Sequence, residues 1–313
     1  MSEKRKEKEA RRAARKDAAK RRSQARVHRD VHGKAHLVIY RDALGKIEDV
    51  GLSRPLFNDS WQNDVAIAAA NTVCELLNDD RTLERAVALA RNAMAATSKI
   101  AEGALALSPD RSPACHAGCS HCCYQAVGVS APEVFAIYDH LRTTRTAADL
   151  EATVGRIRHA DDETRGLTSA ERLSPDLPCP FLESDRCSIY EVRPLACRGT
   201  NSLDAAACER NLRDPEARAQ FLAGSLAVPC FLEPIRAFHA VAAGIELALH
   251  ELHGLRVLPL ELTAAMRIML DDPEKVPQKW LAGGDPFEAA RGADNTNRPH
   301  IDELVGRRVD RAP

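Results

Sequence analysis

Apolar residues recur at every third or fourth position through several long stretches of the chain, which is the spacing of an amphipathic helix. Residues 60–77 show it clearly, and Asp59 or Ser60 is a suitable cap. We expect further helices over residues 81–100, 130–141, 147–165, 235–253 and 261–270. The pattern therefore predicts a mainly α protein with little or no sheet.

Two stretches depart from this helical spacing. Residues 35–50 hold a β-rich run followed by a glycine-containing turn, which predicts a short hairpin. Residues 175–208 carry four prolines and are expected to be rich in loops. The resulting division of the chain is a basic, disordered or solvated helical tail (1–33), an N-terminal helical region (34–110), a cysteine-rich domain (111–212), a C-terminal helical region (213–282) and an irregular tail (283–313).

The first 35 residues have a different charge from the rest of the chain. They carry 14 Lys or Arg residues against 5 Asp or Glu residues, a net charge of +9, while the whole chain sums to −1. No hydrophobic stripe is present to dock this segment as a helix. This composition favours a solubilising tail. The alternative is that the segment makes electrostatic contact with an acidic partner, nucleic acid or the ribosome.

Composition narrows the class of protein. The chain has 313 residues, 44% of them hydrophobic and only 4% aromatic, so we expect a core of Ala, Leu, Val and Ile. No apolar run approaches the roughly 20 residues of a membrane-spanning helix, so no membrane partner is expected. The charged first thirty residues lack the apolar centre of a secretory signal, which predicts a cytoplasmic protein. In that compartment ten cysteines favour reduced thiols over disulfides.

The richest chemistry lies in residues 115–123, Cys-His-Ala-Gly-Cys-Ser-His-Cys-Cys. Thiolates bind zinc tetrahedrally and also hold iron–sulfur clusters, so this stretch predicts a metal site. Gly118 gives the backbone freedom to fold around an ion. Side chains of adjacent residues diverge, so Cys122 and Cys123 need not serve the same ion. Cys179, Cys187, Cys197 and Cys208 bring the total to eight, enough for two four-coordinate sites or one polynuclear cluster.

The arginines and histidines near these thiols each allow two interpretations. Arg193 and Arg198 flank Cys197 and either offset thiolate charge or lie on the surface near a turn. His116 and His121 are additional metal donors, but eight cysteines make them less favoured. The two remaining cysteines, Cys74 and Cys230, are expected to be buried small hydrophobes, Cys74 beside a helical stripe and Cys230 at the start of another.

The order of these blocks resembles a known family. The nonapeptide is followed by Cys179-Pro-Phe-Leu and then by Cys187-Ser-Ile-Tyr-Glu-Val-Arg-Pro-Leu-Ala-Cys197-Arg, as in the YkgJ-like cysteine-cluster proteins described as zinc- or iron-chelating domains. The resemblance covers about residues 113–210. The resemblance implies metal chelation and leaves open whether the chain binds zinc or an iron–sulfur cluster. A similar cluster occurs in bacterial flagellin lysine N-methylases.

We therefore expect a loop-rich cysteine-cluster metal-binding domain between helical flanks, chelating zinc or iron, an iron–sulfur cluster included. The expected ligands are Cys115, Cys119, Cys122, Cys123, Cys179, Cys187, Cys197 and Cys208. One alternative is an iron–sulfur redox enzyme or an S-adenosylmethionine-dependent N-methyltransferase. A second is a zinc-stabilised scaffold whose basic tail binds RNA or the ribosome. No glycine-rich nucleotide loop, hydrolytic triad or paired-carboxylate site supports an assignment of catalytic residues.

Overall fold

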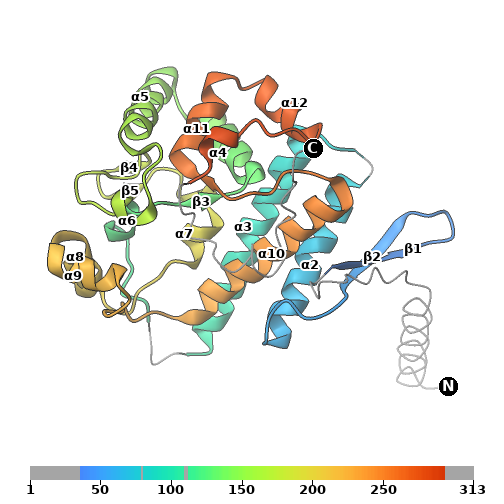
Figure 1. Cartoon of the computed structure of the whole chain (residues 1–313), viewed down its shortest axis with the longest axis horizontal. Coiled ribbons are helices and arrows are strands. Elements are labelled where there is room, and N and C mark those ends of the chain that lie inside the picture. Colours follow the sequence, from blue (N-terminus) through green and yellow to red (C-terminus); the bar gives the residue numbers. More distant parts are fainter. Residues whose placement is uncertain (1–35, 79, 109–111, 293–313) are drawn as a thin grey trace, which may run out of the picture.

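The computed structural model describes residues 36–78, 80–108 and 112–292, and Figure 1 shows that helices dominate them. The helices are α2 (Ser60–Leu77), α3 (Leu83–Ala106), α4 (Ala131–Thr144), α5 (Ala147–Thr164), α6 (Ser169–Arg172), α7 (Leu195–Gly199), α8 (Ala205–Arg213), α9 (Pro215–Leu222), α10 (Leu232–His253), α11 (Leu262–Asp271) and α12 (Lys275–Leu281). Three 3-10 turns, η1 (His121–Tyr124), η2 (Tyr190–Val192) and η3 (Glu288–Ala290), complete them. The mainly α fold is confirmed. The predicted basic tail, 1–33, lies outside the described residues.

Strands occur only as short antiparallel pairs in the described part of the chain. The predicted hairpin is present as β1 (Leu37–Arg41) paired with β2 (Ile47–Leu52). A second pair joins distant segments, β3 (Gly128–Val129) and β6 (Leu260–Glu261). The third pair is β4 (Leu182–Glu183) with β5 (Arg186–Cys187), inside the cysteine region.

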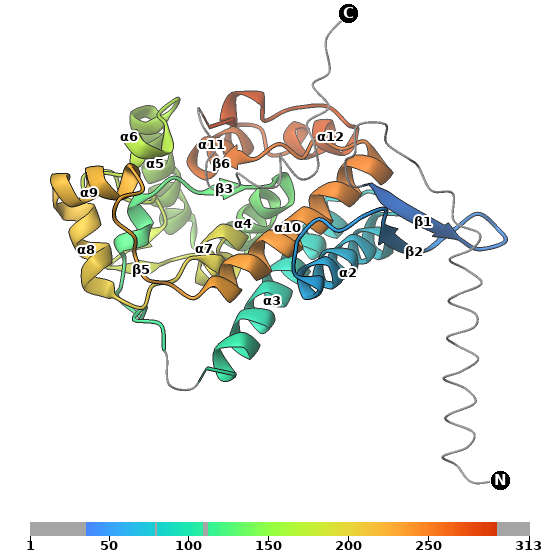
Figure 2. The same cartoon turned by 60° about the horizontal axis from the view of Figure 1, so that its bottom comes forward.

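The centre of the molecule is built on α10, which packs against α2 and α3 (Figures 1 and 2). Gly244 of α10 lies directly on the backbone of α2, where a Cβ atom would fall 2.0 Å from the carbonyl oxygen of Ala66. Such close approach requires glycine at this position. The helix ends at Gly254, whose left-handed φ of 63° suits a helix C-terminus.

The long helices follow the predicted spacing, and the short ones do not. Helix α2 has the expected bounds, while α3 continues past Gly103 to Ala106, because an alanine-rich sequence tolerates one glycine. Helices α7, α8 and α9 fall where no helix was predicted, each too short to show a periodic stripe. Asp204 and Asp214 cap α8 and α9 through their side chains.

Glu133 joins the helical core to the cysteine region. Its carboxylate accepts the backbone N–H and the hydroxyl of Ser130, at 2.8 and 2.7 Å, which is the predicted capping box of α4. Its other oxygen accepts the N–H of Leu195 at 2.8 Å. With only 1% of its surface exposed, Glu133 fixes the start of α7 to the start of α4.

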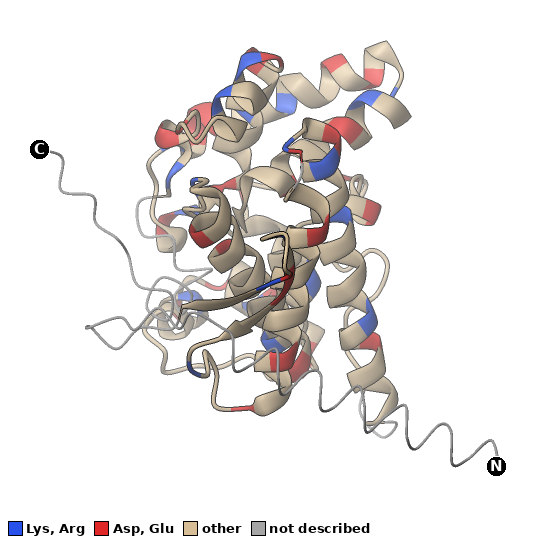
Figure 3. Cartoon of the chain, turned by 90° about the vertical axis from the view of Figure 1, so that its right-hand side faces the viewer, with Lys and Arg blue, Asp and Glu red and all other residues tan. Residues whose placement is uncertain are grey.

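One hydrophobic core takes residues from all three predicted regions between residues 34 and 282, and Cys179 and Cys187 pack against it. Lys and Arg residues are interspersed with Asp and Glu residues along the helices (Figure 3). Within the described ranges, no helix is both long and apolar enough to span a bilayer. The cysteine region is thus packed onto the helices that surround it.

Candidate metal centre

The first four cysteines lie on a short, tightly turned segment that ends in η1. The N–H of Cys119 donates to the carbonyl of His116 at 3.0 Å, and the N–H of Cys123 donates to that of Ser120 at 2.8 Å. Between these turns Gly118 has a φ of 95°, the conformational freedom predicted for it. The segment therefore turns sharply twice before and within η1.

The second cysteine segment is bonded directly to the first. The N–H of Cys179 donates to the carbonyl of Cys123 at 2.6 Å, and the carbonyl of Cys179 accepts the N–H of Leu182 at 2.9 Å. Leu182 then pairs with Cys187 across the β4–β5 hairpin. The chain thus returns Cys187 towards Cys179, through a turn in which Ser184 and Asp185 have positive φ values.

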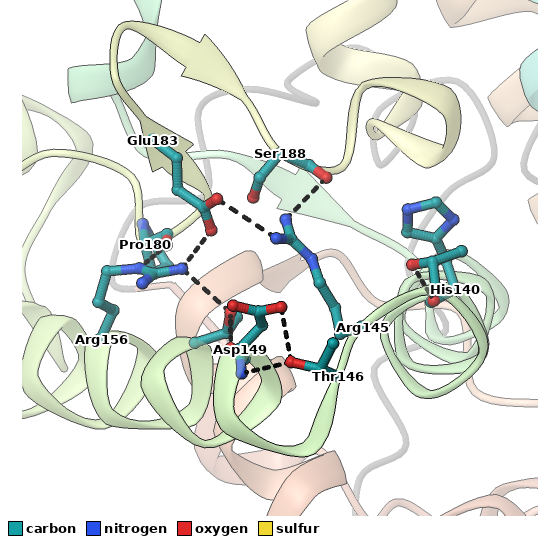
Figure 4. Close-up of polar contacts among 10 residues, drawn as sticks. His140, Arg145, Thr146, Asp149, Arg156, Pro180, Glu183 and Ser188 are labelled. Carbon is teal, nitrogen blue, oxygen red and sulfur yellow. Dashed lines mark hydrogen bonds and ion pairs between the residues drawn. The ribbon is translucent and has the colours of Figure 1, made fainter.

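Two arginines, Arg145 between α4 and α5 and Arg156 of α5, hold this hairpin in place (Figure 4). Glu183 of β4 forms ion pairs with Arg145, at 3.3 Å, and with Arg156. Arg145 also donates to the carbonyl of Ser188 at 3.2 Å, and Arg156 donates to the carbonyl of Pro180 at 2.9 Å. The strand bearing Cys187 is therefore attached to the helical core by side chains as well as by its backbone.

The last two cysteines lie on short helices. Cys197 is on α7, which packs against α3 and α10, and Cys208 is on α8, which contacts η1. Cys115 meets this part of the chain through Ser202, whose N–H donates to its sulfur at 3.3 Å. The structure thus brings thiols from four other segments towards the one that contains η1.

The thiols divide into two neighbouring sets according to which of them interact electrostatically. An inner set consists of Cys123, Cys179, Cys187 and Cys197. An outer set consists of Cys115, Cys119, Cys122 and Cys208. Cys122 also interacts with Cys187 and Cys197, so the adjacent pair Cys122 and Cys123 connects the two sets.

Burial makes the thiolate form costly for most of these groups. It raises the pKa of Cys179 to about 12 and raises the pKa of Cys197 well above that of an ordinary thiol. Mutual repulsion between neighbouring thiolates adds to the effect at both residues. Such crowded thiols fit a cation, because a bound metal ion would supply the positive charge that the thiolates lack.

The adjacent pair behaves differently. A hydrogen bond from Cys123 lowers the pKa of Cys122 to about 7, and the same bond raises the pKa of Cys123. Arg193 lowers the pKa of Cys122 further. The hydrogen bond therefore favours ionisation of Cys122 over that of Cys123.

Arg193 and Arg198 both interact with groups of the cysteine region. Arg193 favours the ionised forms of Cys187 and Cys197, and its guanidinium lies 4.4 Å from the centre of the Tyr190 ring. Arg198 donates to the carbonyls of Arg193, at 3.0 Å, and of Glu191, at 2.5 Å. Arg193 thus offsets thiolate charge, and Arg198 fixes the backbone beside it.

All ten cysteines are free in the structure. Across residues 36–292 apart from the gaps at 79 and 109–111, no three His, Cys, Asp or Glu side chains form a group that could hold a metal ion as they stand. Of the two histidines in the nonapeptide, His116 has its Nδ1 atom 2.9 Å from the carbonyl oxygen of Ala114, and because a carbonyl only accepts, Nδ1 is the donor. Metal ligation by the eight thiols stays a prediction.

Sequence reasoning missed Arg172 and Glu261, which both lie near Cys179. Arg172 is on α6, and Glu261 caps α11 by accepting the N–H of Ala264 at 2.8 Å. Neither belongs to a cysteine motif. In the sequence, α6 is indicated only by the capping-box spacing of Thr168 and Glu171. This spacing does not predict the direction of the Arg172 side chain.

Cys74 lies apart, buried on α2 as expected, and burial raises its pKa to about 11. A thiol whose pKa is raised by folding stabilises the folded state below its unfolded pKa, and this contribution is lost as the pH rises through the folded value. We expect the difference in unfolding free energy between wild type and Cys74→Ala to shrink by about 2 kcal/mol between about pH 8 and about pH 11. Urea titrations at both pH values measure it. A difference that stays constant would contradict the assignment.

The fold and site together define a mainly helical protein with a cysteine-rich region packed against its hydrophobic core. Residues 114–217 match the family model CxxCxxCC, described as a "Putative zinc- or iron-chelating domain". This match confirms the resemblance found from the cysteine blocks, and it covers about a third of the chain. Comparisons with curated proteins and with solved structures gave no match.

Proposed function

We propose that the chain binds zinc or iron through the eight clustered cysteines, with the inner set as the principal site and the outer set as a second one. The observation that carries the proposal is the approach of thiols from four other segments to the segment that contains η1. The family model that matches residues 114–217 supports metal chelation as such.

The donor chemistry supports a soft or borderline cation. Sulfur ligands select zinc and iron–sulfur centres over magnesium or calcium, which prefer oxygen. The inner set offers four such donors: Cys123 from η1, Cys179 from the loop before β4, Cys187 from β5 and Cys197 from α7. A bound ion would supply the charge that keeps these thiols ionised and would cross-link the segments that carry them.

Metal analysis of the full chain, purified without oxygen, tests the proposal. We expect about one to two equivalents of zinc or iron per chain, since the eight thiols suffice for two four-coordinate sites. Colourless protein with zinc identifies a zinc site. Brown protein with acid-labile sulfide identifies an iron–sulfur cluster. Less than about a tenth of an equivalent of either metal, in protein whose thiols are reduced, would refute metal binding.

A further inference from the structure

Arg172 is a buried cation without a carboxylate bound to it. Only 3% of its surface is exposed, although arginine is almost never buried without a charged partner. In the described residues its guanidinium makes no ion pair, and its Nε atom is buried with no hydrogen-bond partner. The nearest interacting carboxylate is that of Glu261, which caps α11. A buried positive charge in this state calls for an anionic neighbour.

The hydrogen bonds of Arg172 lead to the segments of two cysteines of the inner set, Cys123 and Cys179. It donates to the carbonyl of Tyr124, which follows Cys123 directly, at 3.5 Å. It also donates to the carbonyls of Leu177 and Pro178, the second at 3.4 Å, and Cys179 comes next in the chain. The guanidinium therefore spans the two segments that the Cys179–Cys123 backbone bond holds together.

We propose that Arg172 is a positioning residue of the inner set, holding the segments of Cys123 and Cys179 in register and supplying positive charge to a metal–thiolate centre. The inference rests on the proposed metal binding. Four thiolates around one divalent cation leave an excess of negative charge, and burying that charge is costly without a cation nearby. Arg193 lies beside Cys187 and Cys197, so the two arginines flank the set from different segments.

Glu261 carries the charge opposite to that of Arg172, so replacing it should have the opposite effect on metal affinity. Its carboxylate interacts with both Arg172 and Cys179 and opposes negative charge at the set. Removing this charge in Glu261→Gln leaves an amide oxygen that can still accept the N–H of Ala264. If charge at the inner set governs metal affinity, Arg172→Gln weakens binding and Glu261→Gln does not. A purely structural role predicts no gain in Co²⁺ affinity from Glu261→Gln and no recovery of affinity in Arg172→Lys.

Cobalt(II) is the probe for the experiment, because cobalt–thiolate bonds absorb in the visible and report ligation directly. Full-length wild type, Arg172→Lys, Arg172→Gln and Glu261→Gln are titrated with Co²⁺ against a competing chelator, with circular dichroism recorded on each sample. Arg158→Met is the matched control, since Arg158 is half-exposed and pairs with Asp271 at 3.2 Å on the surface. We expect unchanged affinity in this control.

We expect Arg172→Gln to bind Co²⁺ about 10- to 100-fold more weakly, the range seen when a partner of a metal ligand is removed. Arg172→Lys keeps the charge and should recover part of this loss, and Glu261→Gln should bind at least as tightly as wild type. Arg172→Gln within twofold of wild type, or no better binding by Arg172→Lys than by Arg172→Gln, would overturn the inference.

Failure to fold and failure of metal binding give separate results. If Arg172→Gln does not fold, Glu261→Gln decides, and weaker Co²⁺ binding by that folded variant overturns the charge role. If wild type shows no cobalt–thiolate absorption and also purifies with less than about a tenth of an equivalent of zinc or iron, the proposed function fails and the role of Arg172 fails with it. If wild type purifies with iron but shows no cobalt–thiolate absorption, the iron content of Arg172→Gln decides, and wild-type content overturns the inference.

Discussion

Replacing Cys197 with serine is expected to remove the metal from the inner set and to lower the melting temperature by about 10 °C. A serine hydroxyl stays protonated and is a poor ligand for zinc or iron, so only three thiols of the set remain. A ligand present at a thousand times its Kd contributes about 4 kcal/mol to stability, and each kcal/mol shifts Tm by about 2–4 °C in a chain of this size. Metal analysis and calorimetry on the same samples measure both effects.

The Cys74→Ser variant is the matched control for this experiment. Cys74 is buried on α2, away from the cluster, so its substitution should cost some stability and leave metal content unchanged. The decisive comparison is made with a chelator present. The Tm difference between Cys197→Ser and wild type should then become small, because both are metal-free. A difference that persists undiminished would mean that Cys197 acts through packing and not through metal.

Replacing Gly244 with alanine is expected to destabilise the protein by about 3 kcal/mol or more. The added Cβ atom would lie 2.0 Å from the carbonyl oxygen of Ala66, so α10 and α2 would have to separate. Overpacking in a close-packed core typically costs about 1–3 kcal/mol, and here the obstacle is backbone, which cannot rotate away. Denaturant unfolding of the two proteins gives the free-energy difference.

Gly155→Ala is the control for Gly244→Ala, because it adds the same methyl group where there is space for it. Gly155 lies within α5, and a Cβ atom there would meet nothing within 4 Å. Alanine is the better helix former by about 1 kcal/mol, so this variant should be slightly more stable than wild type. Equal effects at the two glycines would show that helix propensity, not the contact with Ala66, governs position 244.

The helical framework could be predicted because its residues carry a local signal. The stripe of α2 and the capping box at Ser130 and Glu133 each lie within a few turns of one helix, so spacing alone identifies them. Short helices carry no such signal. The five residues of α7 become helical because Glu133 accepts the N–H of Leu195 and because α3 and α10 cover them.

The eight candidate cysteines could also be selected from the sequence, but not their grouping. The sequence left open whether the adjacent residues Cys122 and Cys123 serve the same ion, and in the structure their two thiols hydrogen-bond to each other. Which thiols share a set depends on where the chain returns in space, for example on the bond between Cys179 and Cys123. The importance of Arg172 likewise depends on its burial, which no spacing in the sequence reveals.

The carboxylate of Glu133 has a consequence for how the molecule opens. Because it bonds both Ser130 and Leu195 while buried, α7 cannot detach alone without costing this carboxylate the hydrogen bond that it accepts from Leu195. The segment carrying Cys197 should therefore unfold together with α4 as one cooperative unit. Hydrogen-exchange protection in α4 would then increase when metal binds to the cysteine cluster. Metal binding would thus raise the free energy needed to open the helical core.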